Sequence, residues 1–162
     1  MVEKYKRPSW DEYFMNIARE VGKRGTCDRG RNGAVIVKSK RIISTGYVGA
    51  PTGLEHCDEV GHLFMKTIDE NGHTSEHCVR TTHAEQNAIT QAAQHGVSTE
   101  GATLYEKFEP CFTCAKMIIN AGIKRVVCEK RYHAARLTRE FFEKAGVALI
   151  VLTNETENYG RQ

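Results

Sequence analysis

Two short stretches constrain this chain more than any other part of its sequence. Residues 83–85 read His-Ala-Glu, and residues 110–114 read Pro-Cys-Phe-Thr-Cys. Together they supply one imidazole, two thiolates and a carboxylate that is not needed as a ligand. Catalytic zinc is typically held by three such protein ligands, which leave its fourth position open for water, so the fold must bring these distant segments together. The predicted ligands are His83, Cys111 and Cys114, and the predicted base is Glu85.

Each stretch is predicted to begin a helix. Pro110 suits the first helical position, because its missing N–H would have no partner there. Cys111 and Cys114 then share the first turn, where both sulfurs face the same side and the helix N-terminus lowers their pKa. The alternative is a closed zinc site with Glu85 on a helix surface. That alternative needs a fourth cysteine or histidine close by, and none adjoins either motif.

Hydrophobic spacing elsewhere predicts alternating helices and strands. A helix with Ser9 as N-cap precedes two β-branched runs that are separated by only three residues, which is the pattern of a β-hairpin. The remaining elements favour a mixed sheet covered by helices on both faces, so we predict a three-layer α/β/α fold with about five strands. We expect one domain over residues 1–153 and a polar tail at 154–162. The predicted helices are 9–22 (ended by Gly22 or by Gly25), 83–96, 111–121 and 138–145, and the predicted strands are 34–37, 41–47, 102–105, 125–128 and 147–152.

Composition narrows the classes of partner. The chain has 162 residues, of which 40% are hydrophobic and 27% charged. Its net charge is only +3, and its lysines and arginines are interleaved with acidic residues. No concentrated basic stripe favours nucleic acid, and no stretch approaches the roughly 18 apolar residues that span a bilayer. We expect no export signal, because the N-terminus lacks an apolar run. The six cysteines therefore suit metal binding better than disulfides, and we expect a cytoplasmic protein that acts on a small molecule.

The order H-x-E followed by P-C-x-x-C is the signature of zinc-dependent nucleobase deaminases, and this chain resembles the deoxycytidylate (dCMP) deaminases over nearly its whole length. The resemblance implies a cytidine-deaminase-like fold and zinc-dependent hydrolysis of dCMP to dUMP and ammonia, which supplies thymidylate synthesis. One position departs from the family, which usually has Gly-Tyr-Asn-Gly where this chain has Val48 in the third place. The matching segments are residues 33–37, 42–47, 49–51, 56–57, 78–89, 101–105 and 110–127.

Roles at the site follow from the chemistry and from the resemblance. Glu85 is expected to take a proton from the attacking water, pass it to a ring nitrogen and then protonate the departing amine. The resemblance implies that the Ala84 backbone hydrogen-bonds the pyrimidine carbonyl and that Tyr132 stacks on the base. For Tyr132 the alternative is an ordinary amphipathic aromatic on the surface.

A second, structural zinc site is predicted outside these motifs. Residues 48–82 lack periodicity, and so long an irregular segment favours a functional or metal-pinned loop, here with a short helix at about 62–68. Cysteines and histidines clustered in loops are typical metal ligands, and the resemblance implies a structural zinc formed by the corresponding loops. The alternative is a set of free buried thiols. The predicted ligands are Cys27, Cys57, His77 and Cys78, with His56 and His73 as substitutes.

The resemblance also implies homo-oligomers, commonly hexamers, with dCTP as activator and dTTP as inhibitor at a separate site. Residues 28–33 combine glycines with guanidinium groups that suit a triphosphate. The alternative is a solvated turn before the hairpin, because a basic glycine-rich loop alone is a weak signal. The predicted effector residues are Arg29, Arg31 and Asn32.

Two other classes of function stand beside this one. The first is a deaminase of another cytosine nucleotide or nucleoside, or of adenosine in tRNA. A deaminase of tRNA is expected to have a basic groove and a basic C-terminal helix, whereas this C-terminus carries Glu155 and Glu157. The second is a catalytically silent, competence-type binding protein with the same fold. A binding protein has no need of Glu85, so the intact motif favours the enzyme.

Overall fold

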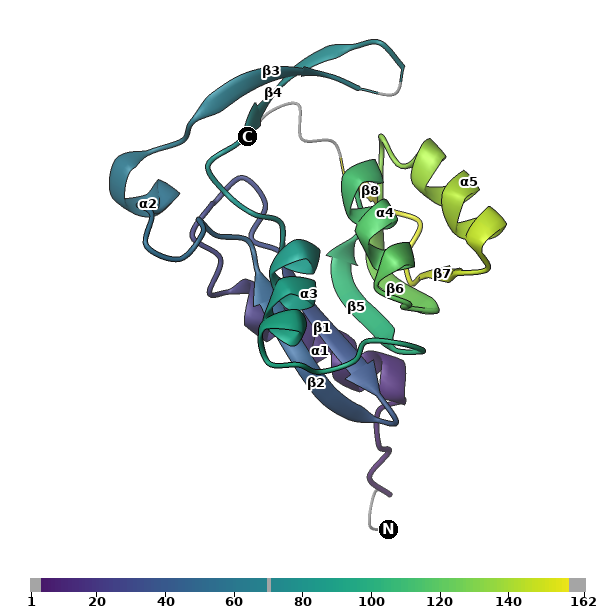
Figure 1. Ribbon diagram of the computed structural model, residues 1–162. Coiled ribbons are helices and arrows are strands. Elements are labelled where there is room, and N and C mark those ends of the chain that lie inside the picture. The colour runs from purple at the N-terminus through teal and green to yellow at the C-terminus, as the bar shows by residue number, and fades with distance from the viewer. Residues whose placement is uncertain (1–3, 70, 158–162) are drawn as a thin grey trace.

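The computed structural model describes residues 4–69 and 71–157, and its centre is a mixed β-sheet (Figure 1). The strands of this sheet are β1 (Gly33–Lys38), β2 (Arg41–Tyr47), β5 (Thr103–Phe108), β6 (Arg125–Tyr132), β7 (Ala148–Val151) and β8 (Thr156–Glu157). Their order is β2-β1-β5-β6-β7, with β8 paired to the last residues of β6. β1 is antiparallel to β2 and β5, whereas β5, β6 and β7 run parallel. The predicted mixed sheet of about five strands is confirmed.

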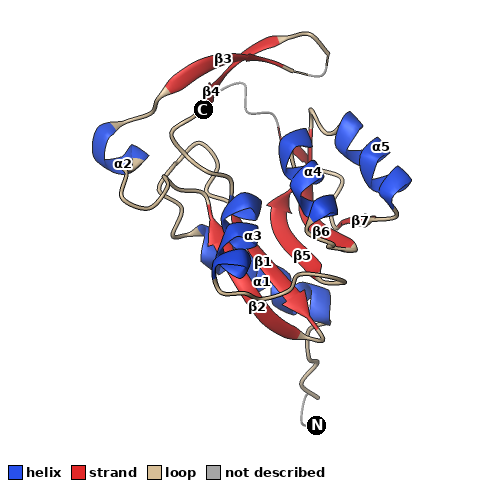
Figure 2. Cartoon of the chain, in the orientation of Figure 1, coloured by secondary structure: helices blue, strands red, loops and turns tan. Residues whose placement is uncertain are grey.

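Helices cover both faces of the sheet, which confirms the predicted three layers (Figure 1 and Figure 2). These helices are α1 (Trp10–Gly22), α3 (Ala84–Gln94), α4 (Phe112–Asn120) and α5 (Arg136–Ala145). On one face, Phe14 and Met15 of α1 pack with strand residues such as Val35 and Tyr105. On the other face, α3, α4 and α5 pack over a second apolar cluster. The central strands are therefore buried on both sides, as their β-branched sequences predict.

The first turn of α3 lies directly against β2, and this contact sets the position of the His-Ala-Glu motif. Gly46 makes the approach possible, since a Cβ there would lie 2.3 Å from both the Ala84 carbonyl oxygen and the Ala88 nitrogen. Ser44 Oγ also donates a hydrogen bond of 2.7 Å to the Ala88 carbonyl. The start of α3 is therefore held on the rigid sheet rather than on a loop.

Residues 48–82 are more regular than we predicted. They contain α2 (Cys57–Val60) and an antiparallel hairpin of β3 (Phe64–Ile68) and β4 (Thr74–Cys78), so the helix expected at about 62–68 is wrong. The hairpin arches away from the sheet, and its two strands pair with each other (Figure 1). Apolar side chains such as Met65 and Ile68 are exposed on it. Because little of the hairpin is buried, its sequence lacks the alternation that marks a half-buried strand.

Part of the predicted C-terminal tail is also regular. Thr156 and Glu157 pair with the last residues of β6, and Lys130 forms an ion pair of 2.6 Å with Glu155. The rest of that tail, residues 158–162, lies outside the described residues. Within the described part of the chain, no helix has the length and apolar character needed to cross a membrane.

Candidate active site

The predicted zinc ligands converge at the starts of α3 and α4. His83 is the N-cap of α3, Cys111 is the N-cap of α4, and Cys114 lies in the first turn of α4. His83 Nδ1 is 3.6 Å from Cys111 Sγ and 3.4 Å from Cys114 Sγ. Tetrahedral zinc, with Zn–S of about 2.3 Å and Zn–N of about 2.0 Å, separates nitrogen from sulfur by about 3.5 Å. This donor set therefore fits zinc, with one coordination position left open.

The start of α4 differs from the prediction. The helix begins at Phe112, so Pro110 precedes the N-cap and does not occupy the first helical position. The Pro110 carbonyl instead accepts a hydrogen bond of 3.0 Å from Thr138 Oγ1, which ties this loop to α5. Cys111 has the extended conformation of an N-cap, and its sulfur still lies with that of Cys114 beside the imidazole.

The three ligands perturb one another's pKa. A hydrogen bond with Cys111 raises the pKa of His83 to about 9. A hydrogen bond with Cys114 lowers the pKa of Cys111 to about 4, and the neighbouring His83 adds to this effect. The same thiol–thiolate hydrogen bond raises the pKa of Cys114. This arrangement favours an imidazolium beside a thiolate. A metal that binds here must displace the protons of His83 and Cys114.

Glu85 lies in the first turn of α3, two residues after His83, and is only 3% exposed. Burial raises the pKa of its carboxyl, and the neighbouring His83 opposes that rise. A raised pKa suits a general base that must hold a proton between two steps of a reaction. Glu85 thus has both the position and the electrostatic character of the predicted base.

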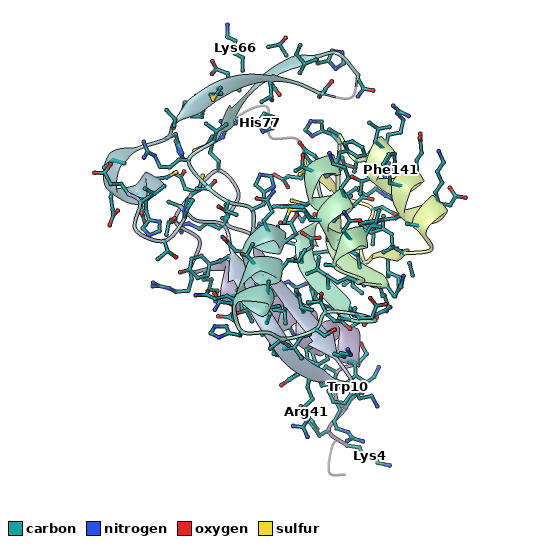
Figure 3. The ribbon with its side chains drawn as sticks, viewed as in Figure 1. Lys4, Trp10, Arg41, Lys66, His77 and Phe141 are labelled. Carbon is teal, nitrogen blue, oxygen red and sulfur yellow. The ribbon has the colours of Figure 1, made fainter. Side chains whose placement is uncertain are left out.

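The ligands and Glu85 line a pocket of about 700 Å³, a size typical of sites for small molecules. Residues of the β3–β4 hairpin, including Ile68 and His77, form part of its wall. Figure 3 shows His77 beneath the hairpin, on the side of the body of the molecule. Both predicted substrate contacts, Ala84 and Tyr132, line this pocket. Tyr132 is 9% exposed, so it is not an exposed surface aromatic.

A second group of metal-binding side chains gathers at the base of the hairpin. Cys27, Cys57 and Cys78 lie with His62, and their ligand atoms are within 4.8 Å of one another. Cys57 Sγ is 3.5 Å from Cys78 Sγ, and Cys27 Sγ is 3.7 Å from His62 Nδ1. Burial raises the pKa of Cys57 to about 12. At Cys78 burial acts in the same direction, but hydrogen bonds from the backbone and from the His62 and Cys57 side chains together outweigh it and lower the pKa to about 7. Four donors around one point fit a closed structural zinc site.

His77, which we predicted as the fourth ligand, points elsewhere. It precedes Cys78 on β4, and successive residues of a strand face opposite sides. Cys78 therefore belongs to the four-donor cluster, whereas the His77 Nε2 lies 2.9 Å from Ser75 Oγ on the other side of the strand. The sequence analysis missed His62, although the spacing Cys57-x4-His62 resembles that of zinc-ligand pairs. The two substitute histidines bond elsewhere, His56 to Thr26 Oγ1 (3.0 Å) and His73 to Asp69 (3.5 Å).

The predicted effector residues divide between two pockets. Arg29 and Arg31 line a smaller pocket of about 330 Å³ together with Lys107. Arg29 also lines the larger pocket, as does Asn32. The Asn32 carboxamide is engaged inside the protein, since its Oδ1 accepts from the Lys107 backbone N–H (3.1 Å) and its Nδ2 lies 3.5 Å from Glu106 Oε2. The structure therefore gathers the two arginines and turns Asn32 inward.

Val48 packs on two residues of the four-donor cluster and lines the pocket that holds the three-ligand cluster. It is 8% exposed, and the two residues are Cys27 and Cys57. Its backbone N–H donates to the Asn32 carbonyl, and its own carbonyl accepts from the Thr26 N–H, both at 3.0 Å. The Val48 side chain therefore offers the pocket an apolar surface only.

Two buried carboxyl groups near the site were missed by the sequence analysis. Glu106 lies on β5 and is 0% exposed, so an acidic residue in an apolar strand was the available signal. Glu109 precedes the Pro-Cys motif and accepts hydrogen bonds from Arg139 Nη2 (2.6 Å) and the Tyr132 backbone N–H (2.9 Å). Glu109 therefore anchors the segment that carries Tyr132.

Comparison with known proteins agrees with this geometry. The model of the cytidine and deoxycytidylate deaminase zinc-binding region matches residues 8–130. ComE operon protein 2 of Bacillus subtilis (strain 168) is 42% identical over 144 residues, which cover 89% of this chain and 71% of that protein. The deoxycytidylate deaminase of Schizosaccharomyces pombe is 38% identical over 143 residues, which cover 88% of this chain and 44% of that protein. The solved structure of dCMP deaminase from the cyanophage S-TIM5 in complex with dCMP and dUMP matches with a TM-score of 0.72 and 28% identity, over 91% of this chain and 99% of that one.

Proposed function

This chain belongs to the cytidine and deoxycytidylate deaminase family, and from that premise we propose that it hydrolyses dCMP to dUMP and ammonia. The observation that carries the proposal is the convergence of three zinc-type ligands and a buried Glu85 on one pocket. The likeness to a phage enzyme solved with dCMP and dUMP favours this substrate over other amines. The product would supply a reaction that methylates dUMP to thymidylate.

The proposed mechanism uses one carboxyl group twice. Zinc held by His83, Cys111 and Cys114 would act as a Lewis acid that lowers the pKa of a water in its open position. Glu85 removes a proton from the attacking water as its oxygen bonds to C4 of the cytosine ring, and delivers that proton to the ring nitrogen N3. Glu85 then transfers the remaining hydroxyl proton to the amino group, the C4–N bond breaks, and ammonia leaves. Its raised pKa supports this alternation between base and acid.

Substrate contacts are assigned to residues that line the same pocket as Glu85. We assign the pyrimidine carbonyl to the Ala84 backbone and stacking on the base to Tyr132, which Glu109 holds by its backbone N–H. Val48 replaces the family's asparagine with an apolar group, so no side-chain hydrogen bond comes from that position. Recognition of the nucleotide then depends on the other polar residues of the pocket.

We propose a second zinc held by Cys27, Cys57, His62 and Cys78, in place of the ligand set with His77. Support comes from the distances among the four ligand atoms and from their chemistry, since three thiols and an imidazole match a closed zinc site. Metal analysis of the purified protein is expected to give about two zinc ions per chain. A value of one would contradict this proposal and leave the catalytic site unaffected.

We further propose a cytoplasmic homo-oligomer, with a hexamer favoured, that dCTP activates and dTTP inhibits. The smaller pocket supports an effector site, because its Arg29, Arg31 and Lys107 outnumber its Asp28 and Glu157, and guanidinium and ammonium groups bind phosphates. Arg31→Ala is the sharper variant, since Arg29 also lines the substrate pocket. It should abolish the response to dCTP and leave basal turnover unchanged, as measured by ammonia release at several effector concentrations.

The decisive experiment is an assay of ammonia release with dCMP, CMP, deoxycytidine and dCTP as substrates. We expect turnover to be fastest with dCMP. Faster turnover of another cytosine compound would show that this compound, and not dCMP, is the substrate. A second candidate function is nucleotide binding without turnover, since the relative that is 42% identical, ComE operon protein 2, is not named as a deaminase. Binding of dCMP without ammonia release would establish that candidate.

A further inference from the structure

The end of the strand that carries Tyr132 is held by a buried ion pair. Glu109 lies in the loop between β5 and α4, its side chain is 0% exposed, and its backbone N–H donates to the Lys130 carbonyl of β6 (3.1 Å). The guanidinium group of Arg139, on α5, binds both carboxylate oxygens of Glu109, from Nε to Oε1 (2.9 Å) and from Nη2 to Oε2 (2.6 Å). Two parallel hydrogen bonds of this kind fix the geometry of an ion pair as well as its charge.

Both members of this pair contact the backbone of Tyr132. The Tyr132 N–H donates to Glu109 Oε2 (2.9 Å), and the Tyr132 carbonyl accepts from Arg139 Nη2 (3.4 Å). Because Nη2 also donates to Oε2, the three residues close a ring of hydrogen bonds around the backbone of one of them. They come from three different segments, namely the loop before α4, the end of β6 and α5. The conformation of the chain at Tyr132 therefore depends on a side chain of α5.

Packing alone does not account for a charged pair at this place. Apolar side chains of similar volume often join buried elements as stably as an ion pair does. Apolar side chains cannot, however, supply an acceptor and a donor to the backbone of one residue, and this pair supplies both to Tyr132. Tyr132 and Glu109 line the large pocket together with Leu137 of α5. The residue that the pair fixes is thus part of the wall of the proposed substrate site.

We infer that Arg139 is a positioning residue for substrate binding: together with Glu109 it fixes the backbone of Tyr132, so that the phenol ring is held where it stacks on the base. Stacking depends on the distance and the orientation of the two rings, so a shift of the backbone weakens it. Loss of stacking between an aromatic side chain and a base lowers affinity about 10- to 100-fold. This inference rests on the proposed function, which places a cytosine base in the pocket.

Arg139→Lys separates the geometry of the pair from its charge. The lysine keeps a positive charge beside Glu109, so the protein should fold, with a melting temperature within about 5 °C of wild type. An ammonium group cannot reproduce the fork that binds both carboxylate oxygens and the Tyr132 carbonyl. KM for dCMP should therefore rise about 3- to 10-fold, with kcat within about 2-fold of wild type and zinc content unchanged.

Arg19→Lys is the matched control. Arg19 of α1 also binds both carboxylate oxygens of a glutamate, with Nε 3.2 Å from Glu129 Oε2 and Nη2 3.0 Å from Oε1, but on the opposite face of the sheet. The same loss of a two-point ion pair should leave KM there near wild type. A rise in KM as large as that in Arg139→Lys would show that the effect does not come from the pocket wall, and would overturn the inference.

A double-mutant cycle with Tyr132→Ala shows whether Arg139 acts through the phenol ring. Tyr132→Ala removes the ring but keeps the backbone N–H and carbonyl, so on its own it should raise KM about 10-fold. Adding Arg139→Lys to Tyr132→Ala should then change KM by less than about 2-fold, because the ring that Arg139 positions is gone. A purely structural role would raise KM by the same factor in both backgrounds, which would contradict the inference.

Amide hydrogen exchange gives a test that needs no turnover. In the zinc-loaded protein without nucleotide, NMR should show faster exchange of the Tyr132 amide in Arg139→Lys, and unchanged exchange at Val127 in the buried part of β6. Unchanged exchange at Tyr132, or an unchanged KM in Arg139→Lys, would refute the positioning role. If wild type releases no ammonia from any cytosine compound, the proposed function fails. The affinity for dCMP measured by calorimetry then takes the place of KM in the same variants.

Discussion

The two clusters of candidate metal ligands in this protein differ in how the chain builds them. In the three-ligand cluster, His83 and Cys111 are N-caps of helices that pack on the sheet, and Cys114 lies within one turn of Cys111. In the four-ligand cluster, the ligands come from the loop after α1, the start of α2, the loop that follows it, and the end of β4. One cluster is therefore placed by the core of the fold, whereas the other joins segments that have little core of their own.

This difference explains what each cluster can do. Three ligands leave a coordination position open, and Glu85 and the pocket lie beside it. Four ligands leave none, so zinc there would only hold loops together. Those loops carry the β3–β4 hairpin, whose His77 and Ile68 line the pocket. The four-ligand cluster should therefore affect activity only indirectly, through the shape of the pocket.

Glu85→Gln should have the largest effect and test the chemical role of the three-ligand cluster. We expect kcat for dCMP to fall about 10²- to 10⁴-fold, because the variant keeps the shape of Glu85 but cannot transfer protons. Zinc content, measured by elemental analysis, should not change. Glu143→Gln, on the exposed surface of α5, is the matched control and should retain full activity. Near-normal ammonia release from Glu85→Gln would show that another group is the base.

His62→Ala and His77→Ala should separate the two clusters. His62→Ala removes one of four ligands, so bound zinc should fall from about two ions per chain to about one, and the melting temperature should fall. His77→Ala should keep both ions and raise KM for dCMP, because His77 lines the pocket. Elemental analysis, thermal unfolding and steady-state kinetics of both variants provide the measurements. Zinc loss from His77→Ala with retention in His62→Ala would restore the ligand set predicted from the sequence.

The number of protons released when zinc binds the three-ligand cluster should report the different pKa values of its ligands. At pH 7, zinc binding to the three-ligand cluster should release about two protons, because His83 (pKa about 9) and the Cys114 thiol start protonated while Cys111 (pKa about 4) does not. The number should fall toward about one as pH rises through about 9, so zinc affinity weakens as pH falls. Calorimetry of the demetallated protein in several buffers, compared with Cys114→Ser, measures it. A count that is independent of pH would contradict the His83–Cys111 pairing.

Val48→Asn, at the contact between the four-ligand cluster and the pocket, should have the smallest effect. The new carboxamide restores the residue that the family usually has, so KM for dCMP should change a few-fold. Stability should fall by about 1–3 kcal/mol, because an amide replaces an apolar group packed on Cys27 and Cys57. Val48→Thr, of similar shape, is the control and should leave KM near wild type. Kinetics and urea unfolding provide the measurements, and an unchanged KM in Val48→Asn would show that position 48 does not contact substrate.

Local sequence was sufficient for the parts of this protein that depend on short spacing. Cys114 lies three residues after Cys111 and shares its helix start, and His83 begins the preceding helix two residues before Glu85, so the gathering of these candidate ligands with Glu85 was predictable. The spacing of apolar residues likewise predicted helices that alternate with strands, and hence a mixed sheet between helix layers, because each element must bury its apolar face against another. The family signature then narrowed the chemistry to deamination.

Tertiary structure decided the features that depend on direction and on long-range packing. His62 and His77 are both near cysteines in sequence, but only the alternation of β4 shows that His77 turns away from Cys78. The β3–β4 hairpin carries no buried stripe, so periodicity did not reveal it. Glu109 looks like one acid before the Pro-Cys motif until the packing of α5 brings Arg139 against its carboxylate. Such contacts join residues far apart in the chain, and no local spacing encodes them.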